Sequence, residues 1–168
     1  MYKTGDTVIY PGTGVCRITD IVKQKFMRCE ERTYYVMKAV YDNSDTTIYC
    51  PVDNADIKLK KLLDKDEIRE LIRTFPTEES LWKENDNERK KYFASIVKEG
   101  DRKKLLKLIT EVHTKKNERE AEGKKLHVSD EKAMAEAEKI LHQELAFSLD
   151  MSTEEVAAFI MKELGIIE

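Results

Sequence analysis

The segment from Thr4 to Val22 constrains the fold most strongly, because it holds two runs of alternating residues on either side of a turn. The turn is Pro11-Gly-Thr-Gly14, in which proline fixes φ and the two glycines can adopt positive φ. Side chains two positions apart share one face of a strand, so each run predicts a strand with two distinct faces. Two short strands are not stable alone in water, so the chain must supply further strands to this hairpin.

Three further β segments are predicted downstream of the hairpin. Residues 33–41 are rich in β-branched and aromatic side chains, and the turn-forming residues 42–45 follow them. Residues 46–50 predict a fourth strand that ends at Pro51, and residues 52–59 predict a short fifth strand. Five short strands within about 60 residues are typical of a small SH3-like or Tudor-like β-barrel.

From Leu63 onward the apolar residues recur with the period of helices. The sequence predicts a bundle of about five short helices, whose ends are marked by capping residues and glycines. The predicted helices cover residues 65–74 after Asp64, from Asp86 or Asn87 to Gly100, from Asp101 to near Gly123, from Ser129 or Asp130 onward, and from the Ser152-x-x-Glu155 capping box to Gly165. The predicted fold class is therefore α+β, with a β-barrel domain at residues 1–62 and a helical domain at residues 63–168.

Composition argues against membrane insertion, metal binding and catalysis. No apolar run approaches the roughly 20 residues of a membrane helix, and the first residues lack the apolar core of a signal peptide. Cys16, Cys29 and Cys50 are widely spaced, which favours reduced thiols over a disulfide framework or a zinc site. The histidines lack metal-ligand spacing, and no nucleophile motif or phosphate-binding loop occurs. We therefore expect a cytoplasmic, monomeric protein that is not an enzyme and uses no cofactor or metal.

Positive charge is concentrated in the middle of the chain, although the net charge is −3. Residues 83–125 carry 14 basic and 9 acidic side chains, whereas residues 126–168 carry 3 basic and 10 acidic ones. Basic residues occur near the start of one predicted helix and near the end of the next, so antiparallel packing would bring them together. A phosphate-binding surface and an ordinary solvated surface of mixed charge are both consistent with this pattern. The basic residues are Arg89, Lys90 and Lys91, followed by Lys115, Lys116, Arg119, Lys124 and Lys125.

Two further segments have the character of binding sites. Residues 46–50 lie between a turn and a proline, which is typical of an edge strand that a partner's strand could extend. The alternative is that this strand closes the barrel. Trp82, the single tryptophan, precedes the basic region; it is either a packing anchor between helices or an apolar wedge into distorted DNA.

Several motifs resemble those of the CarD/CdnL-type bacterial transcription regulators, whose first domain is similar to the polymerase-interacting module of transcription-repair coupling factor. The motifs extend over about nine tenths of the chain. They are Gly5-Asp-x-Val-x-Tyr-Pro-x-x-Gly-Val15, Tyr35-x-x-Lys38, Ile48-x-x-Pro51-Val-x-Asn-Ala55, Gly100-Asp101, Ser129-x-Glu-Lys132 and Ala137-x-x-Ile-Leu-x-x-Glu-Leu-Ala146.

The resemblance implies a non-catalytic factor that binds the RNA polymerase β subunit by strand addition and contacts promoter DNA at the upstream edge of the bubble. Such a factor would change the stability of the open complex, and its DNA binding would be weak unless polymerase tethers it. Family members often carry arginine at the position of Tyr49, so aromatic packing is expected there instead. The implied polymerase contacts are Lys23, Lys25, Thr47, Ile48 and Tyr49. The implied DNA contacts are Trp82, Arg89, Lys90, Lys91, Lys115 and Lys132.

Two other functional classes compete with this interpretation. The first is an adaptor that binds polymerase or another factor through the barrel and never contacts DNA. The second is an RNA-binding Tudor-like module, which is less favoured because residues 1–63 carry 10 basic and 8 acidic side chains and show no concentrated basic face.

Overall fold

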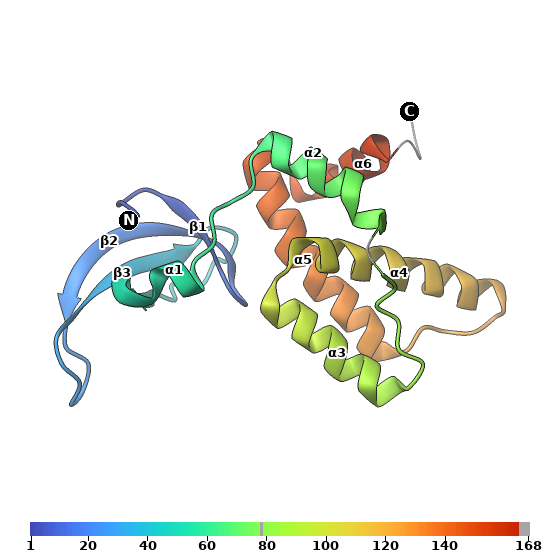
Figure 1. The fold of residues 1–168 in the computed structure, drawn as a ribbon, viewed down its shortest axis with the longest axis horizontal. Helices are drawn as coiled ribbons and strands as arrows, with labels where there is room; N and C mark the ends of the chain where they lie inside the picture. The colour runs from blue at the N-terminus through green and yellow to red at the C-terminus, as the bar shows by residue number, and fades with distance from the viewer. Residues whose placement is uncertain (78, 165–168) are drawn as a thin grey trace. The chain divides into compact units, whose positions relative to one another are not determined.

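The computed structural model describes residues 1–77 and 79–164 of the 168-residue chain. Contacts between residues divide the chain into two compact units, Met1–Leu62 and Leu63–Glu168. The first unit is built around an antiparallel sheet, and the second consists of helices (Figure 1). The predicted α+β fold class, a small barrel-like β unit followed by a helical bundle, is thereby confirmed.

The sheet of the first unit has four antiparallel strands in the order β1-β2-β3-β4, and it is strongly curled (Figure 1). The predicted hairpin turn is present, with Gly12 at φ +80° and Gly14 at φ +95°. The pairing of β2 with β3 shifts between Ile18 and Asp20, and such a bulge bends and twists a strand. The strands are β1 (Thr7–Tyr10), β2 (Gly14–Gln24), β3 (Arg32–Ala39) and β4 (Ile48–Pro51).

The predicted fifth strand at residues 52–59 is wrong. This segment forms a 3-10 turn, η1 (Val52–Asn54), and one turn of helix, α1 (Ala55–Lys58). The helical turn is favoured because Ala55 and Leu59, four residues apart, both become buried. The sheet and this segment enclose the core of the unit, which contains Val8, Cys16, Ile18, Tyr35, Met37, Cys50, Ala55 and Leu59.

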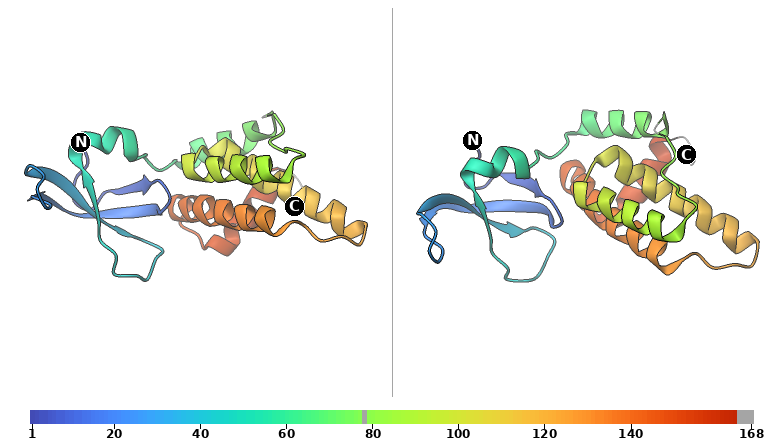
Figure 2. Two further views of the ribbon diagram at one scale, coloured as in Figure 1. Left: turned by 90° about the horizontal axis from the view of Figure 1, so that it is seen from below. Right: turned by 60° about the horizontal axis from the view of Figure 1, so that its bottom comes forward.

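The chain then returns to the first strand of the sheet. The Ile9 N–H donates to the Lys60 carbonyl at 2.8 Å, and the Lys60 N–H donates to the Ile9 carbonyl at 3.0 Å. This pair of hydrogen bonds covers part of the β1 edge. The other edge of the sheet is β4, and the loop that joins β3 to β4 extends away from the sheet in both views of Figure 2.

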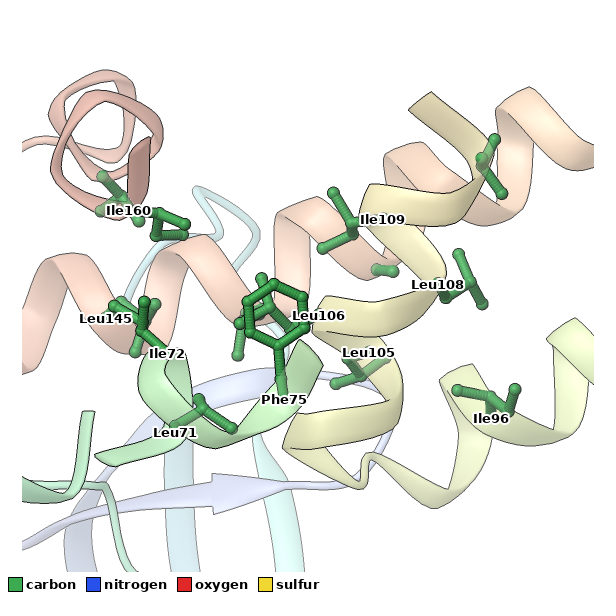
Figure 3. Close-up of a cluster of buried hydrophobic side chains, with 14 of the residues drawn as sticks. Leu71, Ile72, Phe75, Ile96, Leu105, Leu106, Leu108, Ile109, Leu145 and Ile160 are labelled. Carbon is green, nitrogen blue, oxygen red and sulfur yellow. The ribbon is translucent and has the colours of Figure 1, made fainter. Parts of the chain in front are cut away.

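In the described part of the second unit, helix α5 is the central element. It packs against α3, α4 and α6 and also contacts α2 (Figures 1 and 2). The helices are α2 (Lys65–Thr74) followed by the 3-10 turn η2 (Phe75–Thr77), α3 (Asp86–Glu99), α4 (Arg102–Ala121), α5 (Val128–Leu149) and α6 (Thr153–Glu163). Their core includes Leu71, Ile72 and Phe75 near α4 side chains Leu105 and Leu106 and α5 side chain Leu145 (Figure 3).

Most helix ends lie where the capping residues predict them. Asp64 and Ser152 each form a capping box with a glutamate three residues later. Gly100 ends α3 with φ +74°, and Asp101 caps α4 through the Lys104 N–H. Helix α5 is the exception, because it begins at Val128, before the expected Ser129 or Asp130. The predicted stop at Gly165 lies outside the described residues.

Asp130 does not cap α5 because its carboxylate is used inside the bundle. Asp130 and Arg89 are each 1% exposed, and the Arg89 Nε and Nη2 atoms donate to the two carboxylate oxygens at 2.8 Å each. Arg89 Nη2 also donates to the exposed Asp86 carboxylate at 2.8 Å. The pair therefore ties the first turn of α3 to the first turn of α5.

A second buried carboxylate, Glu144, ties other parts of the unit to α5. It is 4% exposed and accepts hydrogen bonds from the Leu63 N–H at 3.1 Å and from Arg102 Nε at 2.7 Å. Among the described residues, no buried side-chain nitrogen or oxygen lacks a hydrogen-bond partner. Among the described residues of the bundle, every buried charged side chain therefore has hydrogen-bond partners.

We predict that Asp130→Ala lowers the free energy of unfolding by about 3–5 kcal/mol, because it leaves the Arg89 charge buried without its main partner. Asp86→Ala should have a much smaller effect, because it removes only the solvent-exposed partner of Arg89. Urea denaturation followed by circular dichroism measures both values. Equal losses from the two substitutions would contradict this description of the pair.

We also predict that one of the three thiols reacts quickly with Ellman's reagent at pH 8 in the folded protein. Cys29 is exposed, whereas Cys16 and Cys50 are buried in the sheet core. Burial raises the pKa of the Cys16 thiol to about 11 and also raises the pKa of Cys50, so both stay protonated and unreactive. Cys29→Ser should remove the fast phase. A fast phase that persists in this variant would show that the sheet core is open.

Candidate binding surfaces

Strand β4 is an edge strand. In the sheet that the structure describes, β4 pairs with β3 and with no second strand, which decides between the edge and the barrel-closing interpretations of this segment. Ile48 is half-buried and Tyr49 is 43% exposed, whereas the next residue, Cys50, is buried in the core. An edge of this kind offers backbone N–H and C=O groups to a partner's strand.

Thr47 lies just before this strand and is exposed. The predicted strand at residues 46–50 therefore begins two residues too early. The local reason is a hydrogen-bonded loop, in which the Ser44 hydroxyl donates to the Asp42 carboxylate at 2.9 Å and lies 3.1 Å from the Thr46 hydroxyl. Side chains that bond to near neighbours in this way compete with strand formation.

Three aromatic rings join β4 to the loop between β2 and β3. The centroid of Phe26 lies 5.1 Å from that of Tyr34 and 5.2 Å from that of Tyr49, and the two tyrosine rings are 6.3 Å apart. All three pairs have the edge-to-face geometry that aromatic rings prefer. Phe26 and Tyr49 are each more than one-third exposed, whereas Tyr34 is 8% exposed. We call these three residues the aromatic cluster.

The aromatic cluster includes one sequence-predicted polymerase contact, Tyr49, and adjoins a second, Lys25. Lys25 precedes Phe26 in the loop, and Lys23 is an exposed residue near the end of β2. The cluster links this loop to Tyr49, whereas Lys23 pairs with Thr33 and therefore lies on the other face of the sheet from Tyr34. The sequence interpretation missed Phe26 and Tyr34. Alternation would have found Tyr34, because its neighbour Tyr35 faces the core and adjacent residues of a strand face opposite sides.

In the helical unit, Trp82 lies where the start of α3 and the middle of α4 meet. Its ring packs edge to face on Phe93, with 6.1 Å between centroids. The Arg89 guanidinium carbon lies 4.3 Å from the ring centroid, and the Lys115 ammonium nitrogen lies 5.3 Å from it. Trp82 is half-buried, so the ring is packed on one part of its surface and open on another.

The open part of the ring borders a shallow groove along α4. Its volume is about 240 Å³, and it is lined by Ser80, Trp82, Lys107, Thr110, Glu111, Thr114 and Lys115. In such a groove, the aromatic ring can stack on the base of a nucleotide, and the ammonium groups and hydroxyls can contact the phosphate of that nucleotide. This groove was not predicted from the sequence, although Lys107, Thr110 and Thr114 share one helix face with Lys115.

The prediction that Arg89 contacts DNA is corrected by the structure. Arg89 is 1% exposed, and its donors are directed to Asp130, to Asp86 and to the Lys83 carbonyl. The hydrogen bond to Asp130 raises the pKa of Arg89, so the buried group is charged. A guanidinium used inside the bundle in this way is not available to a phosphate.

The other predicted basic contacts lie at the surface in different surroundings. Lys90 and Lys91 follow Arg89 and are exposed, and Lys132 is exposed two residues after Asp130. The Arg89–Asp130 pair therefore places Lys90 and Lys132 on two adjacent helix ends. Acidic neighbours offset some of the nearby charge: Glu118 lies 3.6 Å from the half-buried Lys115, and Glu131 lies 3.7 Å from Lys116.

No group of three or more His, Cys, Asp or Glu residues suited to a metal ion occurs among the residues that the structure describes. Within the same ranges, no helix is both long and apolar enough to cross a membrane.

Comparison with known proteins identifies the first unit. The sequence model of the CarD-like/TRCF RID domain matches residues 2–63, so the match covers the four strands, η1, α1 and the residues that lead to α2. Among curated proteins, no relative matches the chain. Residues 64–168 lie beyond the matched range. Residues 2–63 are therefore similar to the CarD-like/TRCF RID domain, whose family interacts with the β subunit of RNA polymerase.

Proposed function

We propose that this protein regulates transcription by binding the RNA polymerase β subunit through β4 and by contacting promoter DNA through its helical unit, which changes the stability of the open complex. The observation that carries the proposal is the unpaired β4 edge beside the aromatic cluster, in a domain of a polymerase-interacting family. The polymerase contacts would be Lys23, Lys25, Thr47, Ile48 and Tyr49, together with Phe26. The DNA contacts would be Trp82, Lys90, Lys91, Lys115 and Lys132.

The edge of β4 supports docking by strand addition. A partner strand would gain backbone hydrogen bonds along β4, and its alternate side chains would meet Tyr49 and the rest of the aromatic cluster. Exposed aromatic residues are well suited to such a contact, because they bury a large area and have few rotatable bonds. Lys23 and Lys25 would add attraction to an acidic partner surface at the rim.

The surface around Trp82 supports a DNA contact. It combines a half-buried aromatic ring, the Lys115 ammonium and the exposed lysines that follow Arg89. Residues 64–168 carry 20 basic and 25 acidic side chains, so attraction of the whole unit to DNA is weak. Tethering to polymerase compensates for this weakness, because a short linker gives an effective concentration of about 1 mM, against a nonspecific Kd on the order of 10⁻⁴ M.

The second candidate is a polymerase-bound adaptor that never contacts DNA. Two observations favour it: Arg89 is used inside the bundle, and Glu118 and Glu131 offset Lys115 and Lys116. The adaptor shares the β4 docking site with the regulator, and the two candidates differ only in what the exposed lysines do.

For docking, we predict that Tyr49→Asp weakens binding to a polymerase β-lobe fragment at least about tenfold, which corresponds to about 1.4 kcal/mol, because it places a charge in the aromatic cluster. Ile48→Asp should act in the same direction. Arg17→Asp is the control, because Arg17 is exposed on β2, two strands away from β4. Pull-down or biolayer interferometry measures the affinity. Unchanged binding by both β4 variants would contradict docking at this edge.

For the DNA contact, we predict that the double variant Lys90→Glu/Lys91→Glu loses the protein's effect on open-complex lifetime while it keeps its affinity for polymerase. The charge reversal repels phosphates and lies outside the β4 surface. Lys98→Glu/Lys139→Glu is the matched control, because it changes the net charge equally at exposed positions away from Trp82. Competitor-challenge assays on a promoter measure the lifetime. An unchanged lifetime effect in the first variant would support the adaptor instead.

A further inference from the structure

The backbone on both sides of Trp82 is fixed to the helices. The Leu81 N–H donates to a Glu111 carboxylate oxygen of α4 at 2.9 Å, and the Leu81 side chain is buried. On the other side, the Lys83 carbonyl accepts a hydrogen bond from Arg89 Nη1 at 2.9 Å. The segment that carries Trp82 is thus attached to α4 at one end and to α3 at the other. With the backbone held in this way, the orientation of the Trp82 ring depends on its side-chain torsions.

The Arg89 guanidinium is itself fixed in orientation. Two of its nitrogens form a fork on the carboxylate of Asp130, and Asp86 and Lys83 accept further hydrogen bonds. A planar guanidinium with partners in several in-plane directions has little freedom to rotate. Its carbon lies 4.3 Å from the centroid of the Trp82 ring, a stacking distance. The hydrogen bonds therefore set the position of a cationic surface against which the indole rests.

Stability alone does not account for this arrangement. A buried ion pair contributes little more to folding than apolar side chains of similar volume would, because desolvation offsets most of the attraction. An apolar pair at positions 89 and 130 could fill the same space between α3 and α5. Such an apolar pair would neither donate a hydrogen bond to the Lys83 carbonyl nor place a cation against the indole.

We propose that Arg89 is a positioning residue for Trp82. It does not contact DNA; held by Asp130, it sets the orientation of the indole so that one part of the ring stays packed and the other borders the groove with Lys115. The consequence for DNA rests on the proposed function, whereas the orientation of the ring is a property of the free protein and can be measured there.

The first experiment uses the fluorescence of Trp82 in the full chain, where it is the single tryptophan. Arg89→Met/Asp130→Leu removes both charges and fills their place with apolar side chains. We expect the acrylamide quenching constant to rise about twofold or more and the emission to shift to the red, because the ring loses the cation that holds it in place and becomes more exposed to water. Unchanged quenching and emission in a variant with wild-type helical content would overturn the proposal.

A control is provided by the ion pair between the buried Glu144 and the partly exposed Arg102. Arg102→Met/Glu144→Gln removes an ion pair of the same kind between α4 and α5 and keeps an acceptor for the Leu63 N–H. This control should leave quenching unchanged. An equal increase in the control would show that Trp82 responds to general loosening of the bundle and would also overturn the proposal.

A second variant covers the case in which the double substitution does not fold. Arg89→Lys keeps a cation opposite Asp130 but cannot form the fork or reach the Lys83 carbonyl at the same time. We expect it to fold and to give quenching between that of the wild type and that of Trp82 in urea. Wild-type quenching in Arg89→Lys would show that the fork does not position the ring.

The effect on transcription separates failure of this inference from failure of the proposed function. In polymerase-bound form, Arg89→Met/Asp130→Leu should reduce the effect on open-complex lifetime as far as Trp82→Ala does, with affinity for polymerase unchanged. If Trp82→Ala lowers the effect and the double variant does not, the positioning role is wrong and the DNA contact stands. If neither Trp82→Ala nor the Lys90 and Lys91 reversal has an effect, the DNA contact is wrong, and the quenching result still decides the positioning of the ring.

Discussion

The unpaired edge of β4 is the constraint on which the functional account depends. A small antiparallel sheet that does not close leaves backbone groups along its outer strands, and natural sheets cover or pair such edges. Here the β1 edge is partly covered by the Lys60 backbone, whereas in the described structure β4 pairs only with β3. The side chains around β4 are aromatic and partly exposed, so this edge is flanked by apolar surface that a partner strand would bury.

The helical unit uses its charges in two different ways. Arg89, Asp130 and Glu144 are buried, and each makes hydrogen bonds that join separate helices or the segment that enters the bundle. Lys90, Lys91 and Lys132 are exposed close to the Arg89–Asp130 pair. The buried set therefore determines where the exposed set lies. The same pair connects the fold to the candidate DNA surface, because the Arg89 guanidinium also lies against Trp82.

Local sequence signals predicted most of the fold. Asp64 and Ser152 predicted helix starts, because a capping box depends only on residues three apart. Gly12 and Gly14 predicted the hairpin turn, because few other residues adopt the positive φ that it requires. The errors came from tertiary contacts. Residues 52–59 are helical because Ala55 and Leu59 reach the core of the β unit together, which strand propensity does not reveal.

The candidate site shows the same division between local and tertiary information. Position in a basic run made Arg89 resemble its neighbours Lys90 and Lys91, and only the contact with Asp130, 41 residues away, marks it as a buried residue. Phe26 was missed because it joins the aromatic cluster from a loop, through contacts with two strands. The turn before β4 and the proline at its end left two interpretations open, an edge strand and a strand that closes the barrel. Only the strand pairing in the sheet distinguishes them.

Hydrogen–deuterium exchange of the full chain, with and without the polymerase β lobe, tests the central claim most directly. Strand addition predicts that the amides of residues 47–50 that point away from β3 become protected on binding, together with those of the loop around Phe26, because a partner strand would hydrogen-bond to the open side of β4. Protection confined to other parts of the chain, with exchange at residues 47–50 unchanged in the complex, would contradict docking at this edge.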